Sequence, residues 1–155
     1  MEIVEAVRNR LKELGSKDNV VAFEVSTHTA AEAAAAVGCS VEEIAKTIVF
    51  QGEADPVLVV TIGSKRIDRN SLGTSIGVRL RSVGAEYIQS RLGMTPGRVT
   101  PLLDVNALVV FDLALEGFPS VWVSAGTPNH VLKVNGATLR KLQPAALWMP
   151  VPGLD

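Results

Sequence analysis

Two apolar runs rich in β-branched residues, TIVFQG (47–52) and PVLVVTIG (56–63), stand close together in this chain. Runs of this kind are typical of buried β-strands. The short connecting segment GEADP (52–56) is polar and ends in proline, which favours a turn over a continuing strand. The sequence therefore predicts two neighbouring strands that form a hairpin, and so a sheet that is at least partly antiparallel.

Amphipathic and capped segments on both sides of this hairpin predict helices. Residues 3–14 place apolar side chains at helical spacing, and residues 27–38 combine a capping threonine, an alanine-rich run and a glycine stop. Ser40 and Glu43 form a capping-box pattern, which predicts a short helix that ends at Lys46. Further helices are expected over 66–77, 84–93 and 135–144, and further strands over 20–25, 78–83, 107–115 and 120–126.

The order of these segments mixes helices with hairpin-like strands. We therefore expect an α+β, or mixed α/β, fold: a single domain over residues 1–155, with one central, antiparallel-rich mixed sheet flanked by helices. The formal net charge of −1 gives no overall basic signature. A nucleic-acid partner would therefore have to be bound by a local basic patch.

The single cysteine, Cys39, allows no disulfide within the chain, which fits a reducing compartment. The N-terminal segment carries acidic residues throughout, unlike a signal peptide. No apolar run approaches the length that crosses a membrane. These features predict a cytoplasmic protein without a membrane partner.

Several kinds of active site are disfavoured by residue type and spacing. His28, His130 and Cys39 are scattered and lack ligand spacing, so no metal site is expected. The chain has no GxSxG elbow, phosphate-binding loop or dinucleotide fingerprint, so no cofactor is expected. Cys39 follows a helix-ending glycine and is interpreted as structural. If the chain is an enzyme, its mechanism needs no covalent nucleophile from the protein.

Three places remain as candidates for chemistry, each with an ordinary structural alternative. Lys46 begins an apolar strand, where it could bind a ligand or simply stabilise a helix C-terminus. The segment GRVTP (97–101), inside LGMTPGRVTPLL, could present backbone N–H groups to a developing negative charge, or be a plain connector. In SAGTPNHVLKV (124–134), small residues at a strand end suggest close approach of a ligand, although a histidine in a turn is common.

Taken in order, these segments resemble the YbaK family of aminoacyl-tRNA deacylases, which includes the editing insertion domain of bacterial prolyl-tRNA synthetase. The resemblance covers nearly the whole chain, and the ordered set is more specific than any one segment. It rests on TAAEAAAAVGCSVEEIAKTIVF (29–50) with Lys46, KRIDRNSLGTSIG (65–77) with Asp68, GMTPGRVTP (93–101) with Gly97 and Pro101, and VVFDLALEGFPSVWVSAG (109–126) with Asp112, Ala125 and Gly126.

The resemblance implies hydrolysis of the ester that joins a wrong amino acid to the 3′ end of a tRNA. An aminoacyl ester is already activated, so positioned water and a stabilised oxyanion suffice. In the family, the adenosine 2′-hydroxyl or the substrate's own side chain is thought to assist the attack. The implied catalytic residues are Lys46, Gly97 and Pro101, and the implied substrate-binding residues are Thr47, Asp68, Arg98, Val99, Thr100, Ala125, Gly126, Asn129 and His130.

Two departures from the family pattern bear on the amino acid removed. Asn129 and His130 stand where many members have glycine and a hydrophobic residue, and Arg98 stands where glycine is common. A histidine here is more similar to the branch that clears alanine, so alanine, or else serine, threonine or cysteine, is the expected amino acid, with proline tRNA as a candidate carrier.

The expected partners are a mischarged tRNA and, as a further candidate, an aminoacyl-tRNA synthetase, with the protein a monomer or a weak homodimer. Two other interpretations stay open: a non-catalytic tRNA-end or regulatory module on the same fold, and an unrelated small-molecule-binding domain. Basic side chains that could contact the tRNA stem, or be ordinary surface charges, are Lys65, Arg66, Arg69, Arg79, Arg81, Arg98 and Lys133.

Overall fold

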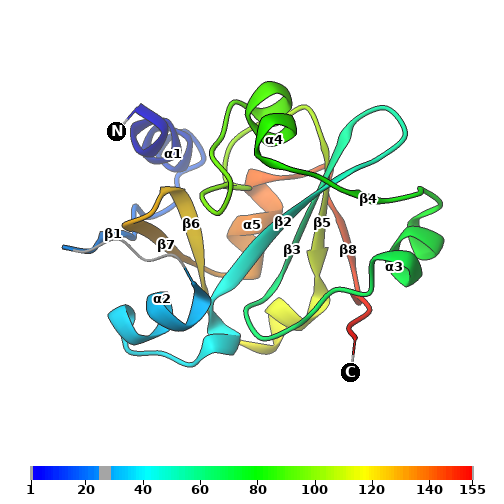
Figure 1. The fold of residues 1–155 in the computed structure, drawn as a ribbon. Coiled ribbons are helices and arrows are strands. Elements are labelled where there is room, and N and C mark those ends of the chain that lie inside the picture. Colours follow the sequence, from blue (N-terminus) through cyan, green and yellow to red (C-terminus); the bar gives the residue numbers. More distant parts are fainter. Residues whose placement is uncertain (1, 25–28, 155) are drawn as a thin grey trace.

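The structure is a computed structural model that describes residues 2–24 and 29–154 (Figure 1). Its helices are α1 (Glu2–Glu13), α2 (Ala30–Val37), α3 (Arg69–Ile76), α4 (Ala85–Leu92) and α5 (Gly136–Leu142), with short 3-10 helices η1 (Val41–Glu43) and η2 (Leu113–Gly117). Its strands are β1 (Val20–Ala22), β2 (Ala45–Gln51), β3 (Pro56–Ile62), β4 (Arg81–Ser82), β5 (Leu108–Asp112), β6 (Val121–Thr127), β7 (His130–Val134) and β8 (Leu147–Met149).

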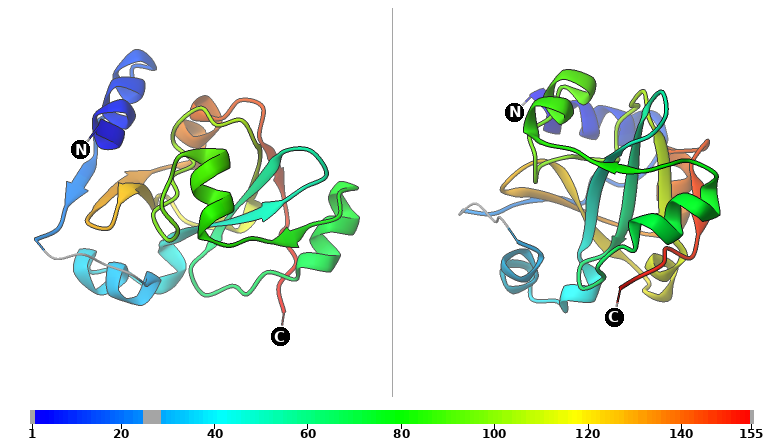
Figure 2. Two further views of the ribbon diagram at one scale, coloured as in Figure 1. Left: turned by 45° about the horizontal axis from the view of Figure 1, so that its top comes forward. Right: turned by 45° about the vertical axis from the view of Figure 1, so that its right-hand side comes forward.

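The larger sheet has the strand order β4-β2-β3-β5-β8 and is buried on both faces. Strands β2 and β3 form an antiparallel hairpin over their whole length, whereas β3–β5 and β5–β8 are parallel. One face packs against apolar side chains of α1, α4 and α5, and the other is covered by α3 through Leu72. The right-hand view of Figure 2 shows α3 in front of the strands and α1 and α5 behind them. Burial on both faces explains why the β3 sequence is continuously apolar.

A smaller antiparallel sheet, with order β1-β7-β6, lies beside β2 of the larger one. The two sheets meet at a single bridge between Ile44 and Trp122. Helix α2 lies over this junction, and it begins and ends at the capping residues that the sequence predicts. The Thr29 side chain accepts a hydrogen bond from the Glu32 N–H, and Gly38 closes the helix at φ 78°. This junction is where the candidate site described below is found.

The mixed α/β fold class is confirmed, while several predicted elements are corrected. The predicted central sheet is in fact two sheets, because β6 turns back at Thr127 into β7, which pairs with β1. The predicted helix from Ser40 is only η1 with its capping box, since pairing with β3 draws the chain into strand from Ala45. The C-terminal tail, in which no strand is predicted, supplies β8 by pairing with β5.

Other predicted elements are shorter than expected. Strand β1 ends at Ala22, and Val25 lies outside the described residues. The strand predicted over 78–83 is reduced to β4, and the one predicted over 107–115 ends at Asp112, where η2 begins. No helix in the described part of the chain has the length and apolar character needed to cross a membrane.

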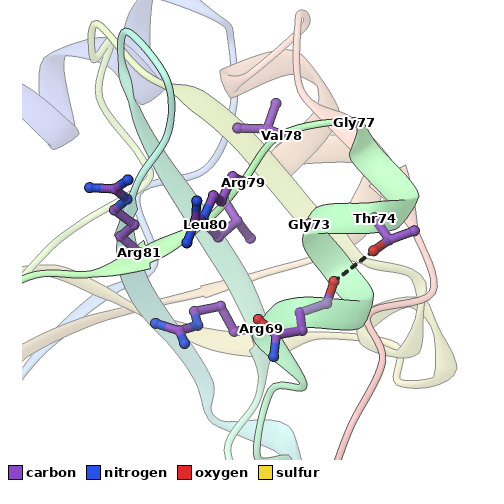
Figure 3. A pocket seen from close by; sticks show the side chains of 9 residues that line it. Arg69, Gly73, Thr74, Gly77, Val78, Arg79, Leu80 and Arg81 are labelled. Atoms are coloured by element: carbon purple, nitrogen blue, oxygen red, sulfur yellow. Dashed lines mark hydrogen bonds between the residues drawn. The ribbon is translucent and has the colours of Figure 1, made fainter.

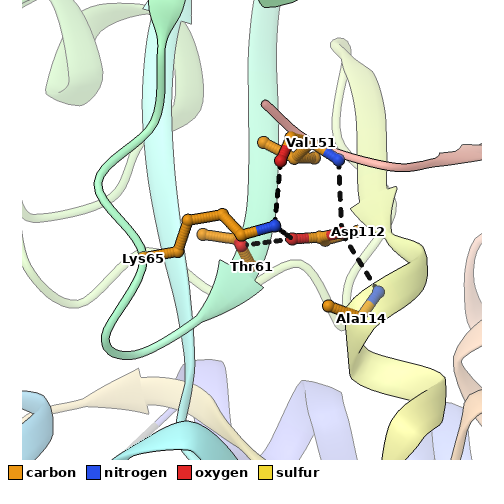
Figure 4. A network of polar contacts seen from close by, with 5 residues as sticks. All are labelled: Thr61, Lys65, Asp112, Ala114 and Val151. Carbon is orange, nitrogen blue, oxygen red and sulfur yellow. Dashed lines mark hydrogen bonds and ion pairs between the residues drawn. The ribbon is translucent and has the colours of Figure 1, made fainter. Parts of the chain in front are cut away.

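A buried carboxylate fastens the ends of the larger sheet together (Figure 4). Asp112, at the end of β5, is 1% exposed. It accepts hydrogen bonds from Thr61 Oγ1 (2.6 Å), Lys65 Nζ (2.7 Å) and the N–H groups of Ala114 (3.1 Å) and Val151 (3.2 Å). Lys65 also donates to the Val151 carbonyl at 2.8 Å. The end of β3, the start of η2 and the C-terminal segment are therefore held by one side chain.

We expect Asp112→Asn to lower the free energy of unfolding by about 3 kcal/mol. Removing one partner of a buried ion pair costs roughly 3–5 kcal/mol, and Lys65 keeps enough contact with water to place the loss at the lower end. Asp104→Asn is the matched control, because Asp104 also forms an ion pair, with Arg10 at 3.0 Å, but is 82% exposed. Urea unfolding of both variants should show a change of at most about 1 kcal/mol for the control. Equal losses would contradict a special role for Asp112.

The stability difference between the wild type and Asp112→Asn should depend on pH. Burial acts to raise the pKa of Asp112, but the hydrogen bonds from Lys65, Thr61 and two backbone N–H groups outweigh it and hold the pKa below its ordinary value. The stabilisation is therefore complete above about pH 3.9, the ordinary Asp pKa, and is lost as the pH falls through the folded-state value. Urea unfolding should show a difference that is constant from about pH 7 to pH 5 and shrinks below about pH 4.

Candidate functional site

A cavity of about 330 Å³ lies where the two sheets meet, at an unpaired edge of β2. Strand β4 pairs with β2 only at Phe50 and Gln51, so the preceding half of β2 has no strand on this side in either described sheet. An unpaired strand edge presents backbone N–H and C=O groups to whatever lies beside it. Residues 45–48 of this edge line the cavity, so a ligand there meets backbone donors and acceptors as well as side chains.

The remaining walls come from segments far apart in the sequence. Helix α2 supplies small side chains, the β6–β7 hairpin supplies hydroxyl groups and an indole, and the loop after α4 closes another side. Most of the lining is apolar or small, with a few polar groups, as is usual for ligand sites. The lining residues outside β2 are Thr29, Ala30, Ala33, Ile44, Gly63, Gly97, Val99, Trp122, Ser124, Thr127, Pro128 and Val131.

Lys46 is the only ionisable side chain among the described lining residues. It is the second residue of β2 and pairs with Thr61 through the backbone, so a helix C-terminus, which the sequence left open, is not its environment. Its ammonium group forms no hydrogen bond or ion pair with another described residue. Partial burial, and after it the positive charge of Arg66, lowers the pKa of Lys46. An anionic group in the cavity would therefore meet an ammonium group that no described carboxylate neutralises.

The glycine-proline segment forms a tight turn at the rim of the cavity. The Arg98 N–H donates to the Thr95 carbonyl at 3.0 Å, and Gly97 has φ 76°. Pro96 followed by a glycine of positive φ is the pattern of a type II turn. No atom lies within 4 Å of the position that a Gly97 Cβ would take, so the backbone conformation, not lack of space, favours glycine. Because the Arg98 N–H is used in the turn, it is not a free donor toward the cavity.

The residues that follow this turn run inward. Val99 lines the cavity, whereas Thr100 and Pro101 are buried next to it. Thr100 Oγ1 accepts a hydrogen bond from the Leu102 N–H at 3.2 Å, and the Pro101 carbonyl accepts one from Gln143 Nε2 at 2.7 Å. Pro101 is therefore not in the cavity wall but anchors the far end of the loop that forms it.

Several predicted site residues lie away from the cavity. Asp68 caps α3, where its carboxylate accepts hydrogen bonds from the Ser71 hydroxyl and N–H, which lower the pKa of Asp68. Ala125 is buried in the core. Gly126, at a bulge in β6, has φ 100° and faces α1, where an added Cβ would lie 2.6 Å from Ile3. Arg98 is half-exposed and is not among the described residues that line the cavity.

His130 and Asn129 lie behind the cavity wall and hold Thr127, which does line it. Thr127 Oγ1 is 2.6 Å from His130 Nδ1 and 3.2 Å from Asn129 Oδ1, while Asn129 Nδ2 donates to the Phe23 carbonyl. His130 is the first residue of β7, not part of the turn, and is 8% exposed. Burial, and after it the charge of Arg8, lowers the pKa of His130, so its imidazole is neutral at pH 7. His28, the other histidine, lies outside the described residues.

The structure thus brings together Lys46, Thr47, Gly97 and Val99 from the predicted set. Sequence reasoning missed Gly63, Trp122, Ser124 and Thr127, because their approach to β2 depends on how the two sheets meet. Among these residues, only those at the end of β6 lie in a segment whose small residues suggested a ligand site. That pattern indicated Gly126 instead of Ser124 and Thr127, which line the cavity. Among residues 2–24 and 29–154, no three His, Cys, Asp or Glu side chains are grouped as a metal site would require.

Comparison with known proteins finds similarity along nearly the whole chain. Residues 24–142 match the family model of the aminoacyl-tRNA editing domain. The uncharacterized protein YwhH of Bacillus subtilis (strain 168) is 27% identical over 150 residues, which make up 96% of each chain. A solved structure of a candidate trans-editing enzyme for prolyl-tRNA synthetase matches with a TM-score of 0.86 and 30% identity over 99% of both chains. The hypothetical protein APE2540 matches with a TM-score of 0.86 and 28% identity, over 94% of this chain and 98% of its own.

We expect Gly63→Ala to disturb the cavity through the backbone. An added Cβ would lie 2.5 Å from the Val41 carbonyl oxygen and 2.9 Å from that of Ile44, so the segment leading into β2 must shift. Overpacking of this kind costs roughly 1–3 kcal/mol. Gly117→Ala is the control, because no atom lies within 4 Å of its added Cβ, and it should change stability by about 0.5 kcal/mol at most. Thermal unfolding of both variants checks this expectation. Equal losses of stability in the two variants would contradict it.

Proposed function

This chain belongs to the YbaK-like family of aminoacyl-tRNA editing domains, and on that premise we propose that it is a trans-editing hydrolase. In this proposal it cleaves the ester between a wrongly attached amino acid and the 3′ end of a tRNA. The observation that carries the proposal is the cavity at the open edge of β2, in which Lys46 is the only ionisable side chain among the described lining residues. A site of this composition suits an activated ester, which needs positioning more than it needs a protein acid or base.

The reaction we propose is attack by a positioned water on the ester carbonyl, with the aminoacyl group in the cavity. Backbone N–H groups along the β2 edge and at Gly97 are the candidates to stabilise the oxyanion, since rigid backbone donors need no reorganisation when charge develops. The tRNA's own terminal hydroxyl is then the leaving group, and assistance by its neighbouring 2′-hydroxyl needs nothing further from the protein. Pro101 would act as a positioning residue that fixes the loop carrying Gly97 and Val99.

We propose that Lys46 holds the terminal phosphate or another polar group of the tRNA end. A compact ammonium group without a described partner can bind a phosphate as a point charge. Arg66, whose charge contributes to the lowered pKa of Lys46, is exposed nearby and favours the same anionic ligand. Thr100 and Arg98 are assigned supporting roles beside the cavity: Thr100 fixes the loop, and Arg98 is available to a phosphate. Asp68 lies farther away and fixes the start of α3.

The substrate side chain we propose is small. A volume of about 330 Å³ is at the lower end of the range for ligand sites and must also admit part of the terminal ribose. Thr47, Thr127 and Val99 would bound the amino-acid side chain, and His130 and Asn129 would keep the Thr127 hydroxyl in place. Alanine is the first candidate, with serine, threonine and cysteine next, and proline tRNA is the candidate carrier. We place this activity in the cytoplasm, acting alone or beside an aminoacyl-tRNA synthetase.

A non-catalytic module that binds tRNA ends is the second candidate function. It is favoured by the same observation, because a cavity whose only described ionisable side chain is a lysine can also serve for recognition alone. Deacylation of tRNAs charged with Ala, Ser, Thr and Cys, compared side by side, separates the two functions. If the protein binds these tRNAs tightly but hydrolyses none of them, the result would favour the non-catalytic module.

We expect Lys46→Ala to lower kcat/KM on the preferred mischarged tRNA by roughly ten- to a hundredfold. A hydrogen bond to a charged group contributes about 1.5–3 kcal/mol, which corresponds to that range. Lys46→Arg should rescue only in part, because a planar guanidinium differs in shape and reach. Melting curves should be nearly unchanged, since the Lys46 side chain pairs with no described residue. Unchanged hydrolysis by Lys46→Ala would remove the best-placed polar residue from the proposed site.

Two further variants test whether a protein nucleophile has been overlooked. Cys39→Ser should retain most activity, because Cys39 does not line the cavity and both its burial and, secondarily, Glu43 raise the pKa of its thiol. Thr127→Val keeps the shape of the side chain but removes a hydroxyl that lies beside a neutral imidazole. If Thr127→Val loses all hydrolysis while its melting curve stays intact, the mechanism would be attack by the Thr127 hydroxyl instead of attack by a positioned water.

A further inference from the structure

A second hollow, separate from the candidate site, lies between α3 and the segment that leads into β4 (Figure 3). Its volume is about 600 Å³, and three arginines, Arg69, Arg79 and Arg81, line it. Two of its lining residues have no side chain: Gly73 lies in α3, and Gly77 lies at the end of that helix. Gly73 is so close to the next segment that an added Cβ would lie 2.7 Å from the Val78 carbonyl oxygen. We call this hollow the arginine groove.

The positive charge of the arginine groove is not neutralised by the described part of the protein. None of its described lining residues is acidic, and none of the three arginines forms an ion pair with a described residue. Arg69 only donates to the Ser82 hydroxyl at 3.3 Å, and Arg79 and Arg81 are exposed. The neighbouring carboxylate, Asp68, is bound to Ser71. Three guanidinium groups with no carboxylate among the described lining residues suit an anion with several oxygens, such as a chain of phosphates.

The surrounding segment is far more basic than the chain as a whole. Residues 56–103 contain seven lysine or arginine residues and two acidic ones, although the formal net charge of the protein is −1. Charge of one sign gathered in one region attracts a polyanion at long range even when the whole molecule is nearly neutral. Of these seven basic residues, Lys65 and Arg91 form ion pairs with Asp112 and Asp55, whereas Arg69, Arg79 and Arg81 line the arginine groove.

The arginine groove is connected to the candidate site through β2. Lys46 stands at the start of β2 beside the cavity, and Gln51, at its other end, pairs with Arg81. Five residues of strand span about 17 Å, which a few nucleotides can bridge. Figure 1 shows α3 and β4 together at one end of the larger sheet, with the cavity end of β2 toward the smaller sheet.

We propose that the arginine groove binds the phosphodiester backbone of an RNA stem whose 3′ end reaches the cavity. This inference rests on the proposed function for the identity of the 3′ end, while the groove itself is assigned only to the phosphates. Such contacts fix the register and orientation of the stem without reading its sequence. They contribute affinity that falls as salt rises, because bound counterions are released from the RNA.

The test uses the full-length protein and a short RNA hairpin that has a single-stranded 3′ extension and carries no amino acid. Binding is followed by fluorescence anisotropy between about 50 and 200 mM KCl. The variant Arg79→Gln/Arg81→Gln removes two exposed charges, so its melting curve should match that of the wild type. The matched control, Lys17→Gln/Lys141→Gln, removes two exposed charges from another hollow, between α1 and α5.

We expect the arginine variant to bind the hairpin about tenfold more weakly at low salt. The slope of log affinity against log salt should fall in magnitude by about 0.9 for each phosphate contact that is lost. Loss of two such contacts would lower it by nearly two. Arg79→Lys/Arg81→Lys should keep the slope while losing part of the affinity, and the lysine control should bind as the wild type does. Unchanged binding by the arginine variant, or an equal loss in the lysine control, would overturn the proposal.

The outcome is independent of hydrolysis, because the probe carries no amino acid. If no mischarged tRNA is hydrolysed but the hairpin binds through Arg79 and Arg81, the groove stands and the proposed activity fails. If hydrolysis occurs and the arginine variant binds the hairpin as tightly as the wild type, the proposed activity stands and the groove fails.

Discussion

The buried carboxylate of Asp112 carries the constraint on which the rest of the structure depends. It holds the end of β3 through Thr61 and Lys65, the start of η2 through Ala114, and the C-terminal segment through Val151. Without a partner, a carboxylate at this depth would cost several kcal/mol, so these four groups are held at fixed distances. The turn after β3 contains Gly63, whose closeness to the carbonyls of Val41 and Ile44 sets where β2 begins. The Asp112 network therefore bears on the position of Lys46 through Gly63, which itself lines the cavity.

The candidate site exists because β2 is paired on one side only where the cavity forms. Its hairpin with β3 is complete, but β4 reaches it only at its far end. An exposed strand edge is ordinarily a liability for aggregation. Here α2, the β6–β7 hairpin and the turn at Gly97 enclose it, leaving backbone groups facing a confined space. That arrangement adds rigid backbone hydrogen-bonding groups to the few polar side chains of the lining, which suits the hydrolysis of an ester that is already activated.

Local signals predicted the parts of the fold that local chemistry decides. Thr29 and Gly38 delimit α2, and Glu43 completes the capping box, as their positions in the sequence indicate. Long-range pairing decided the rest. The chain from Ala45 onward becomes a strand because β3 pairs with it, and the tail becomes β8 because β5 offers an edge. In the site, Lys46 and Gly97 were candidates from their local sequence, and the resemblance supported both. Ser124 and Thr127 could not be predicted. The alternation of side chains along β6 does not decide which face lines the cavity until the position of the second sheet is known.

The charge distribution separates the two tasks that an editing domain has to combine. The cavity holds one lysine among small and apolar groups, which suits recognition of a small amino acid and a single phosphate. The arginine groove is lined by three arginines and by no described acidic residue, which suits a polyanion of any sequence. Strand β2 joins them, so in our proposal a nucleic acid bound at the groove would constrain the position of the ester in the cavity. Because contacts to remote phosphates can be shared by every charged tRNA, discrimination between amino acids would then depend on the walls of the cavity, where Thr47, Val99 and Thr127 lie.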